Sequence, residues 1–198
     1  MLDQVMPLIC SPWLYLIVFV AVTIDGFIPV VPSETVVIGL GAVSAVGSPN
    51  LLALVAAAVA GGVAGDRVSY LLGRKAGARL RKGRMAKAVA KAEQALLRYG
   101  AVAILVGRFL PNGRTATAMM SGSVSLPMGR FRTFSLLASM GWAVYAIGLG
   151  RLGGETFDGS PLLGTAFGLA IGTALAGVCA LVERRLAAVR RRKLVTVG

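Results

Sequence analysis

The feature that most constrains this chain is a short stretch of charges and helix breakers inside otherwise apolar sequence. It reads Gly-Arg-Phe-Leu-Pro-Asn-Gly-Arg-Thr, so that Arg108 and Arg114 flank a break formed by Pro111, Asn112 and Gly113. Loops between soluble helices are usually bordered by polar residues, whereas both flanks of this stretch are small and apolar. An uncompensated cation in such surroundings costs about 2.5 to 3.5 kcal/mol on membrane-insertion scales. The two arginines therefore predict partners of opposite charge elsewhere in the chain.

A matching stretch lies earlier in the chain and carries acids in place of the arginines. Asp25 and Glu34 flank Pro29 and Pro32 there, as the two arginines flank Pro111. Opposite charges at equivalent positions of two halves are what a pseudo-symmetric membrane site needs, because buried ions are tolerated when they are paired or wet. We therefore expect the two broken segments to enter from opposite faces, to meet near the middle of a membrane, and to bring an acid close to an arginine.

The composition indicates an integral helical membrane protein. Of the 198 residues, 56% are hydrophobic, which is more than soluble domains usually contain. The expected fold is all-α, with about four spanning helices of the length that a bilayer requires, two opposed re-entrant helical hairpins, pseudo-symmetric inverted halves and a cytoplasmic amphipathic helix. The net charge of +13 lies beside the apolar segments, which favours anionic lipid headgroups over nucleic acid as partners.

We expect one membrane domain over residues 1–198. Its expected parts are a first half at 13–72 with a re-entrant segment at 27–46, a basic amphipathic surface helix at 74–98, a second half at 101–182 with a re-entrant segment at 101–126, and a basic tail at 183–198. An outside loop is expected to begin at Gly153. The positive-inside rule places the basic helix and the C-terminal tail in the cytoplasm.

A further charged pair lies in the apolar segment of the first half. Asp66 follows Gly65 and precedes Arg67 and Tyr70. The sequence leaves two alternatives open for Asp66, a local pair with Arg67 or a pair with the arginine stretch. We interpret Asp66 and Tyr70 as structural, and glycines in this segment as sites of close helix packing, which supplies packing energy in lipid.

In their order along the chain, these motifs resemble the DedA family of bacterial membrane proteins, which belongs to the wider group with a VTT or SNARE-associated domain. The resemblance covers residues 13–154. The residues that carry it are Phe27, Ile28, Pro29, Pro32 and Glu34, then Gly65, Asp66, Tyr70, Gly73 and Gly77, then Arg108, Phe109, Pro111 and Arg114, and finally Gly122, Phe131, Gly141 and Trp142. The chain departs from the family at Asp25, where members often carry Glu, and at Asn112, which separates the proline from the glycine.

The resemblance implies a lipid transporter or flippase of the bacterial inner membrane, with transport residues at Arg108, Arg114, Glu34 and Asp25. The implied cargo is a phosphate-bearing lipid, either undecaprenyl phosphate or a phospholipid such as phosphatidylethanolamine. Proton motive force is the implied drive, with Glu34 as the main proton carrier; sodium coupling and a homodimer stay open. No bound cofactor or metal is expected. The remaining motif residues, including Pro29, Pro32, Pro111, Asn112, Gly113, Gly65 and Gly122, are expected to shape the fold.

Plainer functions remain as alternatives. The guanidinium groups of Arg108 and Arg114 suit a phosphate, but they could instead reach the interface or neutralise a structural acid. The protein would then be a passive scramblase or a structural membrane factor. An enzyme acting on lipid phosphates is disfavoured, because the chain has no histidine and no acids spaced to hold a metal near the arginines.

Overall fold

The computed structural model describes residues 11–28, 33–45, 47–80, 90, 93–94, 96, 102–107 and 113–157, together with 163, 166–168, 170–171 and 174. Its helices are α2 (Trp13–Asp25), α3 (Ser33–Ser44), α4 (Leu51–Leu80), α6 (Val102–Gly107), α7 (Gly113–Ser123) and α8 (Met128–Thr156). The described residues contain no strand, so the expected all-α class is confirmed.

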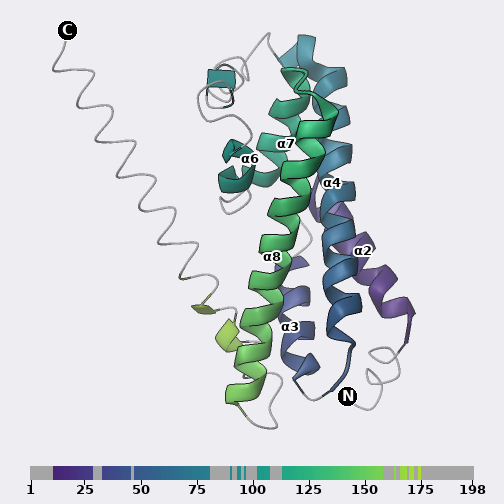
Figure 1. The fold of residues 1–198 in the computed structure, drawn as a ribbon, viewed down its shortest axis with the longest axis vertical. Coiled ribbons are helices and arrows are strands. Elements are labelled where there is room, and N and C mark those ends of the chain that lie inside the picture. Colours follow the sequence, from purple (N-terminus) through teal and green to yellow (C-terminus); the bar gives the residue numbers. More distant parts are fainter. Residues whose placement is uncertain are drawn as a thin grey trace, which may run out of the picture.

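Two long helices, α4 and α8, run antiparallel and form the axis of the molecule (Figure 1). Helix α4 begins after Asn50, whose side-chain Oδ1 accepts the Ala53 N–H at 3.0 Å and so satisfies one of the free donors at a helix start. Helix α8 begins after Pro127. Both helices are long and apolar enough to cross a membrane, over Leu51–Gly77 and Met128–Thr156.

The short helix that follows each broken stretch packs on the long helix of the other half. Helix α3 lies along α8, and α7 lies along α4. Both contacts depend on glycine, because a Cβ atom at Gly150 of α8 would overlap the Ile38 carbonyl of α3, and one at Gly122 of α7 would overlap the Tyr70 carbonyl of α4. Each half of the chain therefore packs its short helix on the long helix of the other half, an arrangement that we call the exchange of short helices.

Two apolar clusters flank the middle of α4. One surrounds Leu54 and Ala58 of α4 and includes residues of α2, α3 and α8. The other contains Tyr70 of α4, packed with Phe131 of α8 and residues of α7. Asp66, which is 3% exposed, lies on α4 between the residues that enter these two clusters. A buried carboxylate in this position needs partners from the surrounding helices.

The first broken segment differs from its expectation. The described part of 27–46 contains one helix, α3, rather than two half-helices. The first arm of the turn is instead α2, which ends at Asp25 and passes into a turn in which Gly26 keeps helical dihedral angles. Helices α2 and α3 are apolar but shorter than a full span.

Other boundaries also shift. Residues 74–80 continue α4 instead of beginning a separate surface helix, since Arg, Lys, Ala and Leu all favour a helix. Helix α8 continues to Thr156, so the loop expected from Gly153 starts later. Most of the expected surface helix and the tail at 183–198 lie outside the described residues. In 101–126, α6 and α7 stand on either side of the break; Gly113 begins α7, and Pro111 and Asn112 lie outside the described residues.

Candidate functional site

Three charged side chains from three helices form a buried cluster, which we call the ion cluster: Asp25, Asp66 and Arg114. Arg114 Nε is 2.8 Å from Asp66 Oδ1, and Arg114 Nη1 is 3.7 Å from Asp25 Oδ2. The Arg114 and Asp66 side chains are 13% and 4% exposed, whereas Asp25 is 24% exposed. The expected approach of an acid to an arginine across the two broken stretches is therefore present, between Asp25 and Arg114.

The positions of these residues follow from where their helices begin and end. Asp25 is the last residue of α2, and Arg114 is the second residue of α7. Asp66 lies in the middle of α4, where the helix backbone is rigid. The end of α2 therefore places Asp25 beside α4, and the start of α7 places Arg114 there. Asp66 is the partner that α4 itself supplies.

Glycines make the slot that holds the guanidinium group. A Cβ atom at Gly26 would lie 2.9 Å from Arg114 Nη2, and one at Gly65 would lie 3.2 Å from the same atom. The open backbone of α4 also offers an acceptor, because Arg114 Nη2 donates to the Gly62 carbonyl at 3.0 Å. A larger residue at Gly26 or Gly65 would push the guanidinium away from its partners.

Hydroxyl groups complete the coordination of both acids. Ser135 of α8 donates to Asp66 Oδ2 at 2.7 Å, so each carboxylate oxygen of Asp66 has a partner. Ser33 of α3 donates to Asp25 Oδ2 at 2.7 Å. Asp66 is therefore held tightly, whereas Asp25 has a longer contact with Arg114 and is more exposed. Of the two acids, Asp25 is the one that another anion would displace more easily.

The turn after α2 is fastened by two further hydroxyl groups. Ser69 of α4 and Thr115 of α7 both donate to the Gly26 carbonyl, at 2.9 and 3.0 Å. A carbonyl at a helix end lacks an intrahelical partner, and these bonds supply one. The end of α2 is thus tied to the same two helices that carry Asp66 and Arg114.

The other expected transport residues are not brought to Arg114 in the described part of the chain. Glu34 is exposed in the first turn of α3, one residue after Ser33, and forms no ion pair with a described residue. Arg108 lies outside the described residues, as do the break residues Pro29, Pro32, Pro111 and Asn112. Gly113, at the far side of the second break, is the first residue of α7.

Tyr70 and Gly122 have the packing contacts of structural residues. The Tyr70 hydroxyl donates to the Leu126 carbonyl at 2.5 Å, and its ring centroid lies 4.7 Å from that of Phe131. Gly122 lies against the Tyr70 backbone, where a side chain would not fit. These residues fix α7 and the start of α8 against α4, and so hold Arg114 in place indirectly.

The structure also decides the alternatives for Asp66 and adds residues that the sequence analysis missed. Asp66 pairs with Arg114, not locally. The missed residues are hydroxyl-bearing: Ser33, Ser69, Thr115 and Ser135. A signal for them exists in the sequence, since each is a small polar residue inside a largely apolar helix. That signal alone does not say which way the hydroxyl points.

Comparison with known proteins relates this chain to membrane proteins of bacteria. It matches the VTT domain family over residues 28–152, a region that contains Asp66 and Arg114 and begins shortly after Asp25. It is 32% identical over 136 residues to the inner membrane protein YghB of Escherichia coli strain K12, a match that covers 65% of the chain and 62% of YghB.

Two further relatives carry names that bear on function. Undecaprenyl phosphate transporter A of Bacillus subtilis is 26% identical over 160 residues, covering 77% of this chain and 81% of the transporter. An alkaline phosphatase-like protein of Lactococcus lactis subsp. cremoris is 25% identical over 148 residues, covering 69% of each chain. No solved structure shows significant similarity to the chain.

Proposed function

We propose a function in membrane lipid transport for this chain, which belongs to the VTT-domain family, the DedA family of bacterial membrane proteins. The cargo we propose is a phosphate-bearing lipid of the bacterial inner membrane, undecaprenyl phosphate or a phospholipid such as phosphatidylethanolamine. Support comes from the relative named undecaprenyl phosphate transporter A, from the inner membrane protein YghB, and from two helices able to span a bilayer.

The observation that carries this proposal is the incomplete pairing of Arg114. Its Nε donates to Asp66 and its Nη2 donates to Gly62, but among the described residues Nη1 has only the 3.7 Å contact with Asp25. A guanidinium group has five N–H donors in a planar fork that matches phosphate oxygens. A lipid phosphate at Nη1 would replace Asp25 while Asp66 continues to hold the arginine in position.

The exchange of short helices supports a transport architecture. We propose that α2 with α3, and α6 with α7, are hairpins that enter the membrane from opposite faces, with the ion cluster where the halves meet. Transporters built from inverted repeats bind cargo near the midplane, at breaks in their helices. Rocking of one half against the other would then expose Arg114 to each side of the membrane in turn.

Proton coupling follows from the exchange at Arg114. When phosphate displaces Asp25, a bare carboxylate would remain in a partly buried site, and protonation would remove that cost. Glu34 directly follows Ser33, which donates to Asp25, and it is exposed at the start of α3. We propose Glu34 as the main proton carrier and Asp25 as the acid that Arg114 releases.

A structural or passive role has one observation in its favour. Asp66 and Arg114 are well paired, and a buried pair of this kind can serve the fold alone. The relative named an alkaline phosphatase-like protein also makes enzyme activity worth testing. The three possibilities differ in what a purified protein would do to lipid in a sealed vesicle.

The deciding experiment uses the purified chain in liposomes that contain fluorescent phosphatidylethanolamine or undecaprenyl phosphate of known sidedness. We expect lipid movement that a proton gradient accelerates, no release of inorganic phosphate, and loss of the acceleration in Glu34→Gln. Equal rates with and without the gradient, in the wild type and in Glu34→Gln, would favour a scramblase. Release of phosphate would favour an enzyme, and the absence of any movement would favour a structural factor.

A further inference from the structure

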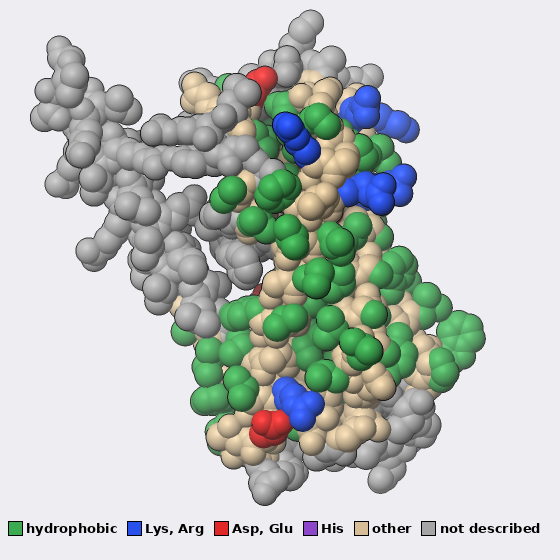
Figure 2. Space-filling view, viewed as in Figure 1, with side chains coloured by type: hydrophobic (Ala, Val, Ile, Leu, Met, Phe, Trp, Pro, Cys, Tyr) green, Lys and Arg blue, Asp and Glu red, His purple; other side chains and the backbone are tan. Residues whose placement is uncertain are grey.

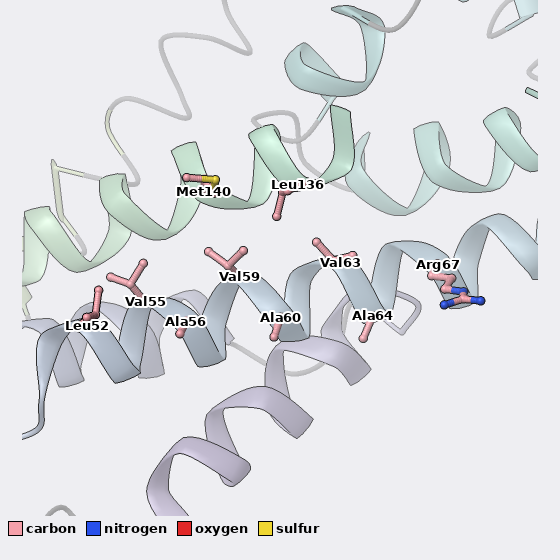
Figure 3. A pocket seen from close by; sticks show the side chains of 10 residues that line it. All are labelled: Leu52, Val55, Ala56, Val59, Ala60, Val63, Ala64, Arg67, Leu136 and Met140. Carbon is pink, nitrogen blue, oxygen red and sulfur yellow. The ribbon is translucent and has the colours of Figure 1, made fainter. Parts of the chain in front are cut away.

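An apolar groove runs along the outer face of α4, beside α8. Figure 3 shows its lining side chains, with Leu52 at one end and Arg67 at the other. Its volume is about 700 Å³, and Leu136 and Met140 of α8 form part of its wall. From Leu52 to Arg67 the groove follows α4 for about 22 Å, because a helix rises 1.5 Å per residue.

The alanines of α4 give the groove its shape. Ala56, Ala60 and Ala64 recur every four residues and so share one face of the helix. Val59 and Val63 point toward α8 in Figure 3, on the other side of the row. The alanines point away from α8 in Figure 3, so bulkier lining side chains border their strip of methyl groups on the α8 side, and an extended hydrocarbon chain can lie along it. The length of the groove exceeds half of a hydrocarbon core, which is about 30 Å thick.

Arg67 is the only charged residue among those that line the groove. It is exposed, and it forms no ion pair with any residue that the structure describes. It lies inside the apolar segment Leu51–Gly77, about 10 Å along the helix from Arg74, where the basic end of α4 begins. A cation at this depth on the outer face of a membrane helix is costly, and an anion beside it lowers that cost.

We propose that this groove is a lateral binding site for a phosphate-bearing lipid, with one hydrocarbon chain lying along Ala56, Ala60 and Ala64 and the phosphate on Arg67. Charge and shape agree, because an apolar channel with a guanidinium group at one end matches a lipid with a phosphate at one end. Arg132 stands on the same face of α8 as Leu136 and Met140, at spacings of four residues, and is exposed. It adds a second cation one turn beyond Leu136.

Binding of a lipid in this groove would precede its transport at Arg114. This inference rests on the proposed function, because that function identifies the cargo as a phosphate-bearing lipid. Arg67 follows Asp66 directly in α4, so a phosphate held at Arg67 on the outside is one residue away from the buried ion cluster. A lipid that enters from the bilayer would meet Arg67 first and Arg114 second. The groove would thus concentrate phosphate-bearing lipids beside the transport site.

The test is photo-crosslinking of the full chain in maltoside micelles, which contain no phosphate. The probes are phosphatidic acid and diacylglycerol that carry the same diazirine-tagged chain. We expect phosphatidic acid to label the α4 peptide about ten-fold more than diacylglycerol, the ratio that one charge-assisted hydrogen bond confers. In Arg67→Gln the ratio should fall well below the wild-type ratio, because only Arg132 remains beside the groove, whereas Arg151→Gln, an exposed arginine already paired with Glu155, should keep the wild-type ratio.

Ala60→Trp is a second variant, which fills the groove and should reduce labelling by both probes. Equal labelling by the two probes in the wild type, or an unchanged ratio in Arg67→Gln, would overturn the site. The labelling would then report non-specific contact with lipid, as at the surface of any membrane protein. Crosslinked dimers joined through α4 would instead assign the groove to a second copy and also overturn it. Labelling needs no transport, so a selective groove in a protein that moves no lipid would uphold the site and reject the proposed function.

Discussion

Among the single residues, Asp66 and Asp25 have different roles beside Arg114. Asp66 is nearly fully buried and bonded through both oxygens, to Arg114 and to Ser135. Asp25 is more exposed and lies 3.7 Å from the guanidinium. Because removal of one partner leaves a buried charge uncompensated, the tighter pair has the larger effect on stability. We infer that Asp66 holds Arg114 in place, and that the contact of Asp25 with Arg114 is the one that a lipid phosphate replaces.

This difference predicts unequal effects of two matched substitutions. Asp66→Asn should lower the free energy of unfolding by about 3 to 5 kcal/mol, as expected for a broken buried pair. Asp25→Asn should lower it much less. Glu155→Gln, which breaks an exposed pair with Arg151, should change it by about 1 kcal/mol or less. Thermal unfolding of the purified variants in detergent measures all three, and an equal loss for Asp66→Asn and Asp25→Asn would contradict the assignment.

Much of the ion cluster could be predicted from residue types alone. Arginines and acids inside apolar sequence imply partners, and that reasoning predicted Asp25 or Glu34 beside Arg108 or Arg114; the structure shows Asp25 with Arg114. The partner chosen by Asp66 could not be predicted, because Arg67 is adjacent in sequence and only the rotation of α4 turns Asp66 inward and Arg67 outward. The serine donors escaped prediction for the same reason, since their direction depends on how the helices are packed.

At the scale of helices, glycine contacts decide how closely α3 approaches α8 and α7 approaches α4. Gly150 and Gly122 lie directly against carbonyl groups of the neighbouring helix. In lipid, where apolar surface gains little by leaving the bilayer, such close backbone packing is a main source of association energy. The helix ends were harder to predict, because α4 continues through charged residues that favour a helix, and α8 continues through glycine-rich sequence that packs on α3.

Alanine substitutions test these contacts, with two other glycines of α8 as controls. Gly150→Ala and Gly122→Ala should each lower the free energy of unfolding by about 1 to 3 kcal/mol, since the added methyl group overpacks the interface. A Cβ atom at Gly148 or Gly141 meets nothing within 4 Å, so alanine there should stabilise helix α8 by up to about 1 kcal/mol. Unfolding in detergent measures the sign, and a uniform sign across the four variants would contradict the packing account.

At the scale of the whole molecule, charge is distributed unevenly along the long axis. In Figure 2 most of the visible Lys and Arg side chains lie at one end of the molecule, and a single acidic and basic pair lies at the other. The basic end includes Arg74 and Lys75 of α4 and Arg130 and Arg132 of α8, all exposed. From the positive-inside rule we predict that this end faces the cytoplasm.

Cysteine labelling in intact cells checks this orientation. Cys10 and Cys179 are first replaced by Ser, and a single cysteine is then placed at Lys75 or at Glu155. A membrane-impermeant maleimide should label Glu155→Cys in intact cells and Lys75→Cys only after the membrane is opened. The reverse labelling pattern would show that the basic end faces the outside of the cell, and would contradict the orientation predicted from the charges.

If Arg114 holds the lipid phosphate during transport, its replacement by lysine should slow the movement of lipid, and the rate of lipid movement by Arg114→Lys in liposomes measures this. Lysine keeps the charge beside Asp66 but lacks the planar fork. We predict that the variant inserts and folds, as judged by its unfolding temperature, yet moves phosphate-bearing lipid at least about ten-fold more slowly, the loss expected for one charge-assisted hydrogen bond. A folded Arg114→Lys protein that moves the lipid at the wild-type rate would contradict the claim.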